Sequence, residues 1–159
     1  MTIIMTEARR RKTVLIPYTM LTPVFSLDVL PGMLAICQLG PRNAFPKWMH
    51  RSSSFLSITR TPGELSVIID ENIVPDNVEA ARGYRAMRVK GPLQLDMVGV
   101  ISTLSAPLAT AGIPVVTIST YDTDYLLVHW KHLAHARWAL EAEGHTVMDE
   151  PKVKKAASF

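Results

Sequence analysis

Cysteine is almost absent from this chain, since Cys37 is the only one among 159 residues. A single cysteine excludes an intrachain disulfide and a metal site built from cysteines. Cys37 lies in the apolar run GMLAICQL, where a buried strand residue is more common than a nucleophile. The sequence therefore predicts a buried thiol without a chemical role.

A long apolar run is absent as well, because no stretch approaches the roughly 18 residues that span a bilayer. The N-terminal sequence MTIIMTEARRRK places its apolar residues before its charges, which is the reverse of a secretory signal. We therefore expect a cytoplasmic protein with no membrane partner. With 48% hydrophobic and 19% charged residues, the chain can form one domain or two small units with a shared core.

Charge of one sign is not concentrated in the body of the chain, although the net charge is +3. Of the 17 Lys and Arg residues, four lie in Ala8–Lys12 and three in Pro151–Lys155, so the excess is at the two ends. Short flanking runs are not the basic surface with interleaved aromatics that nucleic-acid binding needs. We expect solvated tails and no nucleic-acid partner.

The motifs of common enzymes and cofactor sites are missing, because the chain contains no GxGxxG, GxxxxGK[ST], GxSxG or HExxH. No cofactor is therefore expected. His129, His132 and His135 are spaced by three, but no cysteine or nearby carboxylate completes a metal site with them. We interpret them as solvated or partner-facing, and Trp130 and Trp138 as core or interface anchors.

The hydrophobic pattern predicts an alternation of strands and helices. The predicted elements are a strand over 25–41 broken at Pro31-Gly32, one helical turn within 42–51, a hairpin over 53–70 with a type II turn at Pro62-Gly63, a loop over 71–83, a strand over 84–92, a helix over 95–113, a hairpin over 117–128, a helix over 130–145 and a strand over 146–149. Asp96 is the predicted N-cap of the first long helix. Its predicted apolar face consists of Val98, Ile101, Leu104, Leu108 and Ala111.

The first half repeats this order in a reduced form. The segment Ile58–Ile68 overlays Ile118–Val128 without a gap at an offset of 60, which sets Glu64 on Asp124. From the preceding Gly-Pro to the overlaid isoleucine there are 17 residues in the first copy and 26 in the second, so most of one helix is missing from the first.

We therefore predict an α+β fold of two βαββαβ, ferredoxin-like units, the first with a degenerate first helix. The predicted division is an extension over 1–24, a first unit over 25–83, a second over 84–149 and a basic tail over 150–159.

One constellation in the second unit has the chemistry of a ligand site. The helix that starts after Asp96 presents free backbone N–H groups over residues 97–100, and these donors with the helix dipole suit a carboxylate. Gly99 leaves room for close approach, and Asp124 in the hairpin can bind a cationic group. A purely structural role for the turn aspartates is the alternative.

The segment GPLQLDMVGVISTLSAPLATAGIPVVTISTYDTDYLLV, residues 91–128, resembles the ACT-domain family. The similarity is to aspartokinase-type ACT domains and to the tandem-ACT proteins related to the animal cytosolic arginine sensor, and SFLSITRTPGELSVII resembles their N-terminal half. The resemblance implies tandem ACT units that bind a free amino acid at an interface between units, without catalysis. It implies ligand contacts from Met97, Val98, Gly99, Val100, Thr120, Tyr121 and Asp124.

Two departures sharpen the functional expectation. Met97 stands where the arginine-sensor relatives carry a second acidic residue, which leaves a less cationic amino acid open as the ligand. The chain carries no kinase domain, so a regulated target would be a separate protein.

We therefore expect a regulatory sensor, a homodimer rather than an enzyme. The alternatives are an interaction module that has lost its ligand, or a small enzyme that uses Asp122, Asp124 and His129.

Overall fold

The computed structural model describes residues 23–150, so most of the N-terminal extension and most of the basic tail lie outside the described residues. Eight strands form one sheet with two α-helices and three short 3-10 turns. The strands are β1 (Ser26–Val29), β2 (Leu34–Leu39), β3 (Leu56–Arg60), β4 (Leu65–Asp70), β5 (Ala80–Val89), β6 (Val116–Ser119), β7 (Asp124–His129) and β8 (Thr146–Asp149). The helices are α1 (Val100–Thr110) and α2 (Leu133–Ala142), and the 3-10 turns are η1 (Lys47–Arg51), η2 (Glu71–Ile73) and η3 (Trp130–His132).

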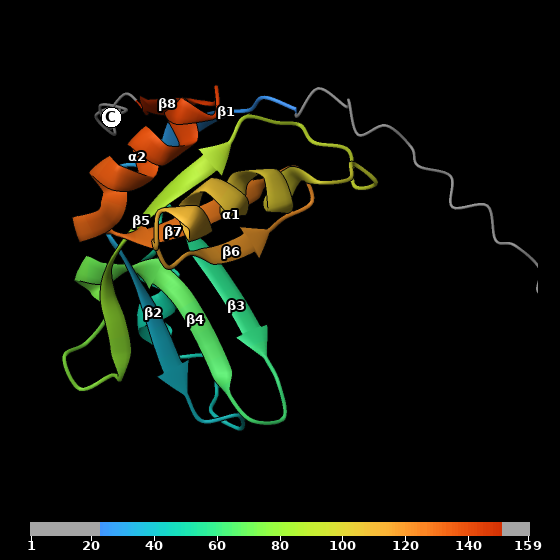
Figure 1. The fold of residues 1–159 in the computed structure, drawn as a ribbon. Coiled ribbons are helices and arrows are strands. Elements are labelled where there is room, and N and C mark those ends of the chain that lie inside the picture. The colour runs from blue at the N-terminus through green and yellow to red at the C-terminus, as the bar shows by residue number, and fades with distance from the viewer. Residues whose placement is uncertain (1–22, 151–159) are drawn as a thin grey trace, which may run out of the picture.

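The long strand β5 belongs to two ferredoxin-like units at once (Figure 1). Its first half pairs with β2, which completes the order β3-β4-β2-β5 of a first unit. Its second half pairs with β7, and β6 lies outside β7 at the edge of the second unit. The predicted α+β fold of two ferredoxin-like units is therefore confirmed, and the sequence boundary between residues 83 and 84 falls inside β5.

The N-terminal strand β1 lies in the sheet of the second unit. It pairs antiparallel with β5 on one side and parallel with β8 on the other, so it separates the first and last strands of that unit. The sequence division assigns residues 25–29 to the first unit, but their hydrogen-bonding partners are in the second. Only residues 30–33 join β1 to β2, so the chain passes from one unit to the other within four residues.

The two α-helices cover one face of the second unit, and its core is formed between them and the sheet. Leu104 and Leu108 of α1 and Leu140 of α2 are fully buried against the sheet. In the first unit, η1 and η2 stand where the second unit has helices, in agreement with the predicted loss of a helix. Cys37 is buried there, and burial raises the pKa of its thiol, which suits a core residue.

The helix-free faces of the two units pack against each other. Leu34 and Ile68 of the first unit share an apolar cluster with Ala86 and Leu127. Phe55 meets Tyr125 edge to face, with ring centroids 5.2 Å apart. The shared strand and this contact bring the two units into one compact body.

The two hairpins match at an offset of 59, so the predicted offset of 60 is wrong. Arg60 pairs with Leu65 where β3 and β4 begin to separate, and Ser119 pairs with Asp124 at the same point of β6 and β7. Asp124 therefore corresponds to the buried Leu65, while Glu64 falls one residue earlier, in the turn. A slip of one residue exchanges the two faces of a strand, so the overlay gives no shared acidic position.

The turn between β3 and β4 differs from the predicted type II turn. That turn needs a positive φ at its third residue, and Gly63 has none. The Thr61 hydroxyl instead accepts hydrogen bonds from the N–H groups of Gly63 at 3.3 Å and Glu64 at 3.2 Å. A side chain that closes its own turn in this way replaces the left-handed glycine.

His145 fixes the start of β1 and should make the stability of the fold depend on pH. Its Nδ1 accepts a hydrogen bond from the backbone N–H of Phe25 at 3.2 Å, and its side chain is buried. Burial lowers the pKa of His145 from the ordinary value of 6.5, although the Thr103 carbonyl and the Glu143 carboxylate act in the opposite direction. The folded chain therefore prefers neutral His145.

We expect the contribution of His145 to the free energy of unfolding to be constant above pH 6.5. It should fall as the pH drops from 6.5 toward the lowered pKa that His145 has in the folded chain. Below 6.5 the unfolded chain binds a proton that the folded chain resists. Urea titrations between pH 7.5 and 5 measure this slope. His145→Asn should flatten it and the matched variant of the exposed His135 should retain it; equal slopes in all three proteins would contradict the assignment.

Candidate ligand-binding site

Helix α1 begins one turn later than the sequence predicts. Gly99 is the N-cap, with a left-handed φ of 91°, and the predicted cap Asp96 lies outside the helix. The Thr103 N–H donates to the Gly99 carbonyl at 2.9 Å, and no side chain caps the helix. The N–H groups of the first helical residues, Val100 and the two that follow, therefore have no partner in the helix.

The chain before α1 is held against the turn between β6 and β7. The Leu93 N–H donates to the Asp122 carbonyl at 2.8 Å, and the Thr123 hydroxyl donates to the Val89 carbonyl at 2.6 Å. Gly91 permits this approach, because a Cβ there would lie 2.8 Å from the Asp122 carbonyl oxygen. Two segments about 30 residues apart in sequence thus form one wall.

The turn itself is closed by the hydroxyl of Thr120. This hydroxyl donates to the Thr123 carbonyl at 2.8 Å and accepts from the Thr123 N–H at 3.2 Å. The bond is the same kind of side-chain closure as at Thr61 in the other hairpin. Thr120 therefore has its hydroxyl engaged in the turn, and it shapes the site through the backbone.

A pocket of about 310 Å³ lies between the start of α1 and this turn. Six of the seven residues that the sequence singles out line it, namely Met97, Gly99, Val100, Thr120, Tyr121 and Asp124. Val98 does not line it, because it precedes the left-handed Gly99 and its side chain is 90% exposed. All of these residues come from one chain.

Asp124 is the acidic residue of the pocket. It is the first residue of β7, opposite Ser119 of β6, and is half buried. Among residues 23–150, its carboxylate takes part in no hydrogen bond or salt bridge. The exposed Asp122 does not line the pocket, and its carbonyl accepts the hydrogen bond from the Leu93 N–H that holds the loop against the turn.

Sequence reasoning missed part of the lining. The missed residues are Leu93, Gln94, Leu95, Ile101, Ser102, Ser119 and Thr123. Gly91-Pro92 was a usable signal for the loop, since a glycine next to a strand end marks a close backbone approach. The apolar members of this loop give the pocket an apolar side opposite Asp124.

The other candidate sites do not assemble. Asp124 and His129 are the first and last residues of β7, and five residues of extended chain separate them by roughly 16 Å. Within the part of the chain that the structure describes, no three His, Cys, Asp or Glu residues are grouped to hold a metal. Trp130 and Trp138 are exposed, so neither is a core residue.

The comparisons with known proteins concern the family and the fold. The family model described as an ACT domain matches residues 79–142, which run from β5 to the end of α2. A protein of Agrobacterium tumefaciens with a crystal structure is 31% identical, with 84% of this chain and 99% of that chain covered at a TM-score of 0.77. The chain is an ACT-domain protein, in one family with the Agrobacterium protein.

The first unit of this ACT-domain protein is matched separately. A model of the N-terminal domain of another family matches residues 32–77, which hold β2, β3 and β4. A Vibrio cholerae protein described as a possible transport protein shares the fold at a TM-score of 0.63 and 18% identity, over 77% of this chain and 91% of that one.

The regulatory subunit of aspartate kinase from Thermus thermophilus shares the fold at a TM-score of 0.51 and 9% identity, over 74% of this chain and 93% of that one. Among proteins with curated functions, none matches this chain. No helix within residues 23–150 is long and apolar enough to cross a membrane.

Proposed function

We propose that this ACT-domain protein is a regulatory sensor that binds a free amino acid in the pocket at the start of α1 and catalyses no reaction. One observation carries the proposal: unpartnered backbone donors and a carboxylate without a partner border the same 310 Å³ pocket. The N–H groups of Val100 to Ser102 suit the carboxylate of an amino acid, and the helix dipole adds to their effect. Asp124 suits its ammonium group through a charge-assisted hydrogen bond.

The apolar side of the pocket favours a neutral, apolar amino acid. Leu93, Leu95 and Met97 lie on the loop side, and the lining holds one acidic residue. A guanidinium or a second ammonium group would need a second carboxylate, and Met97 supplies none. The volume suits a ligand the size of leucine or methionine better than a nucleotide.

A second copy of the chain would complete the site. Leu95, Val98 and Tyr121 are exposed apolar residues around the mouth of the pocket, although single chains seldom expose such a cluster. The edge of β6 next to them pairs with no other described strand. We therefore infer a homodimer that covers this mouth, and a separate protein as the target that the dimer regulates.

Binding is testable with the free protein and the common amino acids. We expect leucine, methionine, isoleucine or valine to raise the melting temperature, and arginine to have a smaller effect. A ligand at 100 times its dissociation constant adds about 2.7 kcal/mol to the free energy of unfolding. Asp124→Asn should weaken binding about 10- to 100-fold in calorimetry, because a hydrogen bond to a charged group contributes about 1.5–3 kcal/mol.

Asp122→Asn is the matched control, since it changes an aspartate two residues away that does not line the pocket and that holds Leu93 through its backbone carbonyl. This variant should bind as the parent does. Absence of stabilisation by every amino acid, or equal binding by the Asp124→Asn protein, would refute the proposal.

A further inference from the structure

A row of exposed side chains runs along β3 on the face that η1 partly covers. Leu56 and Ile58 stand directly opposite Ile69 and Val67 of β4, so they point to the same face as those core residues. Ile69 and Val67 are fully buried, whereas Leu56 is 45% and Ile58 is 40% exposed. The cover formed by η1 and η2 therefore protects the centre of the first unit and leaves its edge strand open.

The second unit shows that this edge does not need aliphatic residues. Thr117 of β6 faces the buried Leu126 of β7, just as Ile58 faces Val67. A threonine thus fills the matching position in the same chain. An isoleucine at the exposed position is a property of the first unit and not a requirement of the fold.

Arg60 and Phe45 extend the row at one end. The guanidinium of Arg60 lies 5.0 Å from the centre of the Phe45 ring, and it donates to the carbonyls of Pro41 and Asn43. Phe45 is 56% exposed. Arg60 follows Ile58 on the same face of β3, so the aromatic ring continues the apolar row through the stacked guanidinium. We call Phe45, Leu56 and Ile58 the β3 row.

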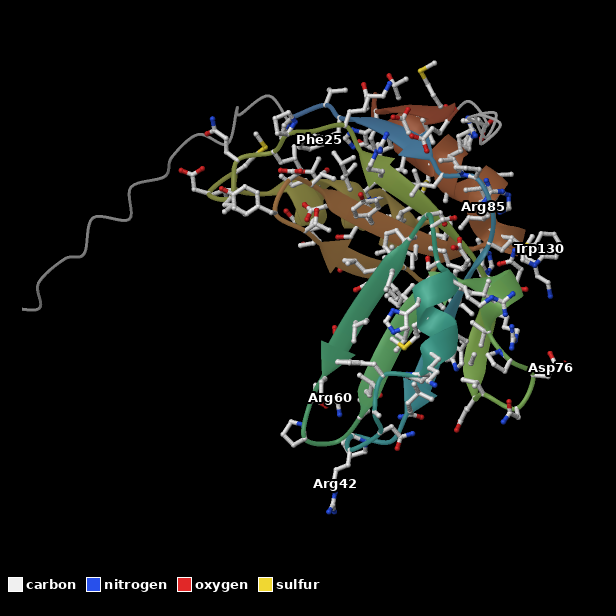
Figure 2. All side chains as sticks on the ribbon, turned by 180° about the vertical axis from the view of Figure 1, so that it is seen from behind. Phe25, Arg42, Arg60, Asp76, Arg85 and Trp130 are labelled. Atoms are coloured by element: carbon white, nitrogen blue, oxygen red, sulfur yellow. The ribbon has the colours of Figure 1, made fainter. Side chains whose placement is uncertain are left out.

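Basic residues outnumber acidic ones around the β3 row, although Glu64 and Asp70 lie at the two ends of the neighbouring strand β4. No acidic residue occurs between Asp28 and Glu64, and the same stretch holds Arg42, Lys47, Arg51 and Arg60. The body of the chain is thus neutral in total but not locally. None of these four cations forms a salt bridge with another described residue. Figure 2 shows Arg42 and Arg60 together at the tip of the first unit, far from α1 and α2.

The backbone of β3 is itself an unfilled binding edge. Within residues 23–150 it pairs with β4 alone, so every second N–H and C=O of β3 points away from the sheet. The five residues LSITR contain no proline, and their one charged residue is the last. Proteins commonly protect such edges with charges, prolines or bulges, and β3 has none of these before Arg60.

We propose that this edge binds an extended, acidic segment of a partner protein as an additional strand next to β3. The free backbone groups of β3 would form hydrogen bonds with the segment. Every second side chain of the segment would be apolar and would pack against the β3 row, and the four cations would attract the acidic side chains between them. Nucleic acid fits less well, because aliphatic Leu56 and Ile58 offer no stacking platform for bases. The inference is independent of the amino-acid site, which lies in the other unit.

The probe is a labelled ten-residue peptide in which Glu alternates with Val or Ile, titrated with the full chain in fluorescence anisotropy. Two control peptides keep its length: one replaces Glu with Lys, and one carries two prolines that block strand pairing. We expect binding of the acidic peptide alone, and at least a fivefold loss between 50 and 200 mM salt.

Ile58→Thr, which copies the residue at the matching position of the second unit, should weaken binding about 5- to 10-fold. Thr117→Ala changes the equivalent site in the second unit and should leave binding unchanged. Amide NMR shifts on addition of the peptide should be confined to β3, β4 and the 41–46 loop.

Three results would overturn the inference. The first is equal or no binding of all three peptides. The second is stronger binding of anionic vesicles or of single-stranded DNA than of the acidic peptide. The third is self-association of the chain that Ile58→Thr abolishes, because a second copy would then occupy the edge.

Discussion

A fragment of residues 84–150 is expected not to fold, although it contains a complete βαββαβ order. The fragment lacks β1, which lies between β5 and β8 and bonds to both. It also lacks Phe25, Leu27 and Val29, which are buried in the core under α1 and α2. Three such side chains contribute roughly 5–9 kcal/mol on burial, which is comparable to the whole stability of a small domain.

Circular dichroism melting and an amide NMR spectrum of the fragment measure this effect. A fragment of residues 23–150 is the control, and it should unfold in one cooperative transition. If residues 84–150 alone show a cooperative transition and dispersed amide signals, β8 can pair with β5 directly, and β1 is dispensable.

Gly91→Ala is expected to reduce both stability and amino-acid binding. The added Cβ would lie 2.8 Å from the Asp122 carbonyl oxygen, and this neighbour is backbone and cannot rotate away. The loop and the turn must then separate, which would also strain the Leu93 N–H bond to the same carbonyl. Overpacking of this kind destabilises proteins by about 1–3 kcal/mol. The loss in binding free energy should exceed the loss in the free energy of unfolding, because the separation moves Tyr121 and Asp124 away from α1.

Gly63→Ala is the matched control for this variant. Gly63 also lies at a hairpin turn, but its φ is not positive, and the nearest atom to an added Cβ is 3.9 Å away. Its free energy of unfolding should change by less than about 0.5 kcal/mol. Chemical denaturation of both variants compares them, and a Gly91→Ala protein as stable as the Gly63→Ala protein would contradict the close packing of loop and turn.

The types of the elements follow from the sequence, but their partners do not. Alternation in LSITR and LSVIID marks two strands with a turn between them, and the structure contains that hairpin. The same pattern marks β1 as a strand without saying which strands it pairs with. Its insertion between β5 and β8 depends on contacts more than 50 residues away in sequence.

The candidate site was predictable where local chemistry decides and unpredictable where one backbone angle decides. The free N–H groups at the helix start, Gly99 and Asp124 were predicted from local chemistry, and the resemblance to ACT domains added Thr120 and Tyr121; the structure brings six of the seven residues together. Val98 was wrongly included in the apolar helix face, because helical periodicity was counted through Gly99. The left-handed φ of Gly99 starts the helix after it and turns Val98 to the solvent. Periodicity contains no information on such an angle.

The sharing of β5 also restricts how this protein can change during evolution. One inserted or deleted residue in the middle of β5 would exchange the inward and outward side chains of one half while leaving the other half in place. The same ten-residue strand supplies residues to both hydrophobic cores, since Met87 and Val89 belong to one core and Ala80 packs against the other. Insertions and deletions are therefore expected to accumulate in the loops. The two units should be inherited together, because neither can be exchanged without the strand that they share.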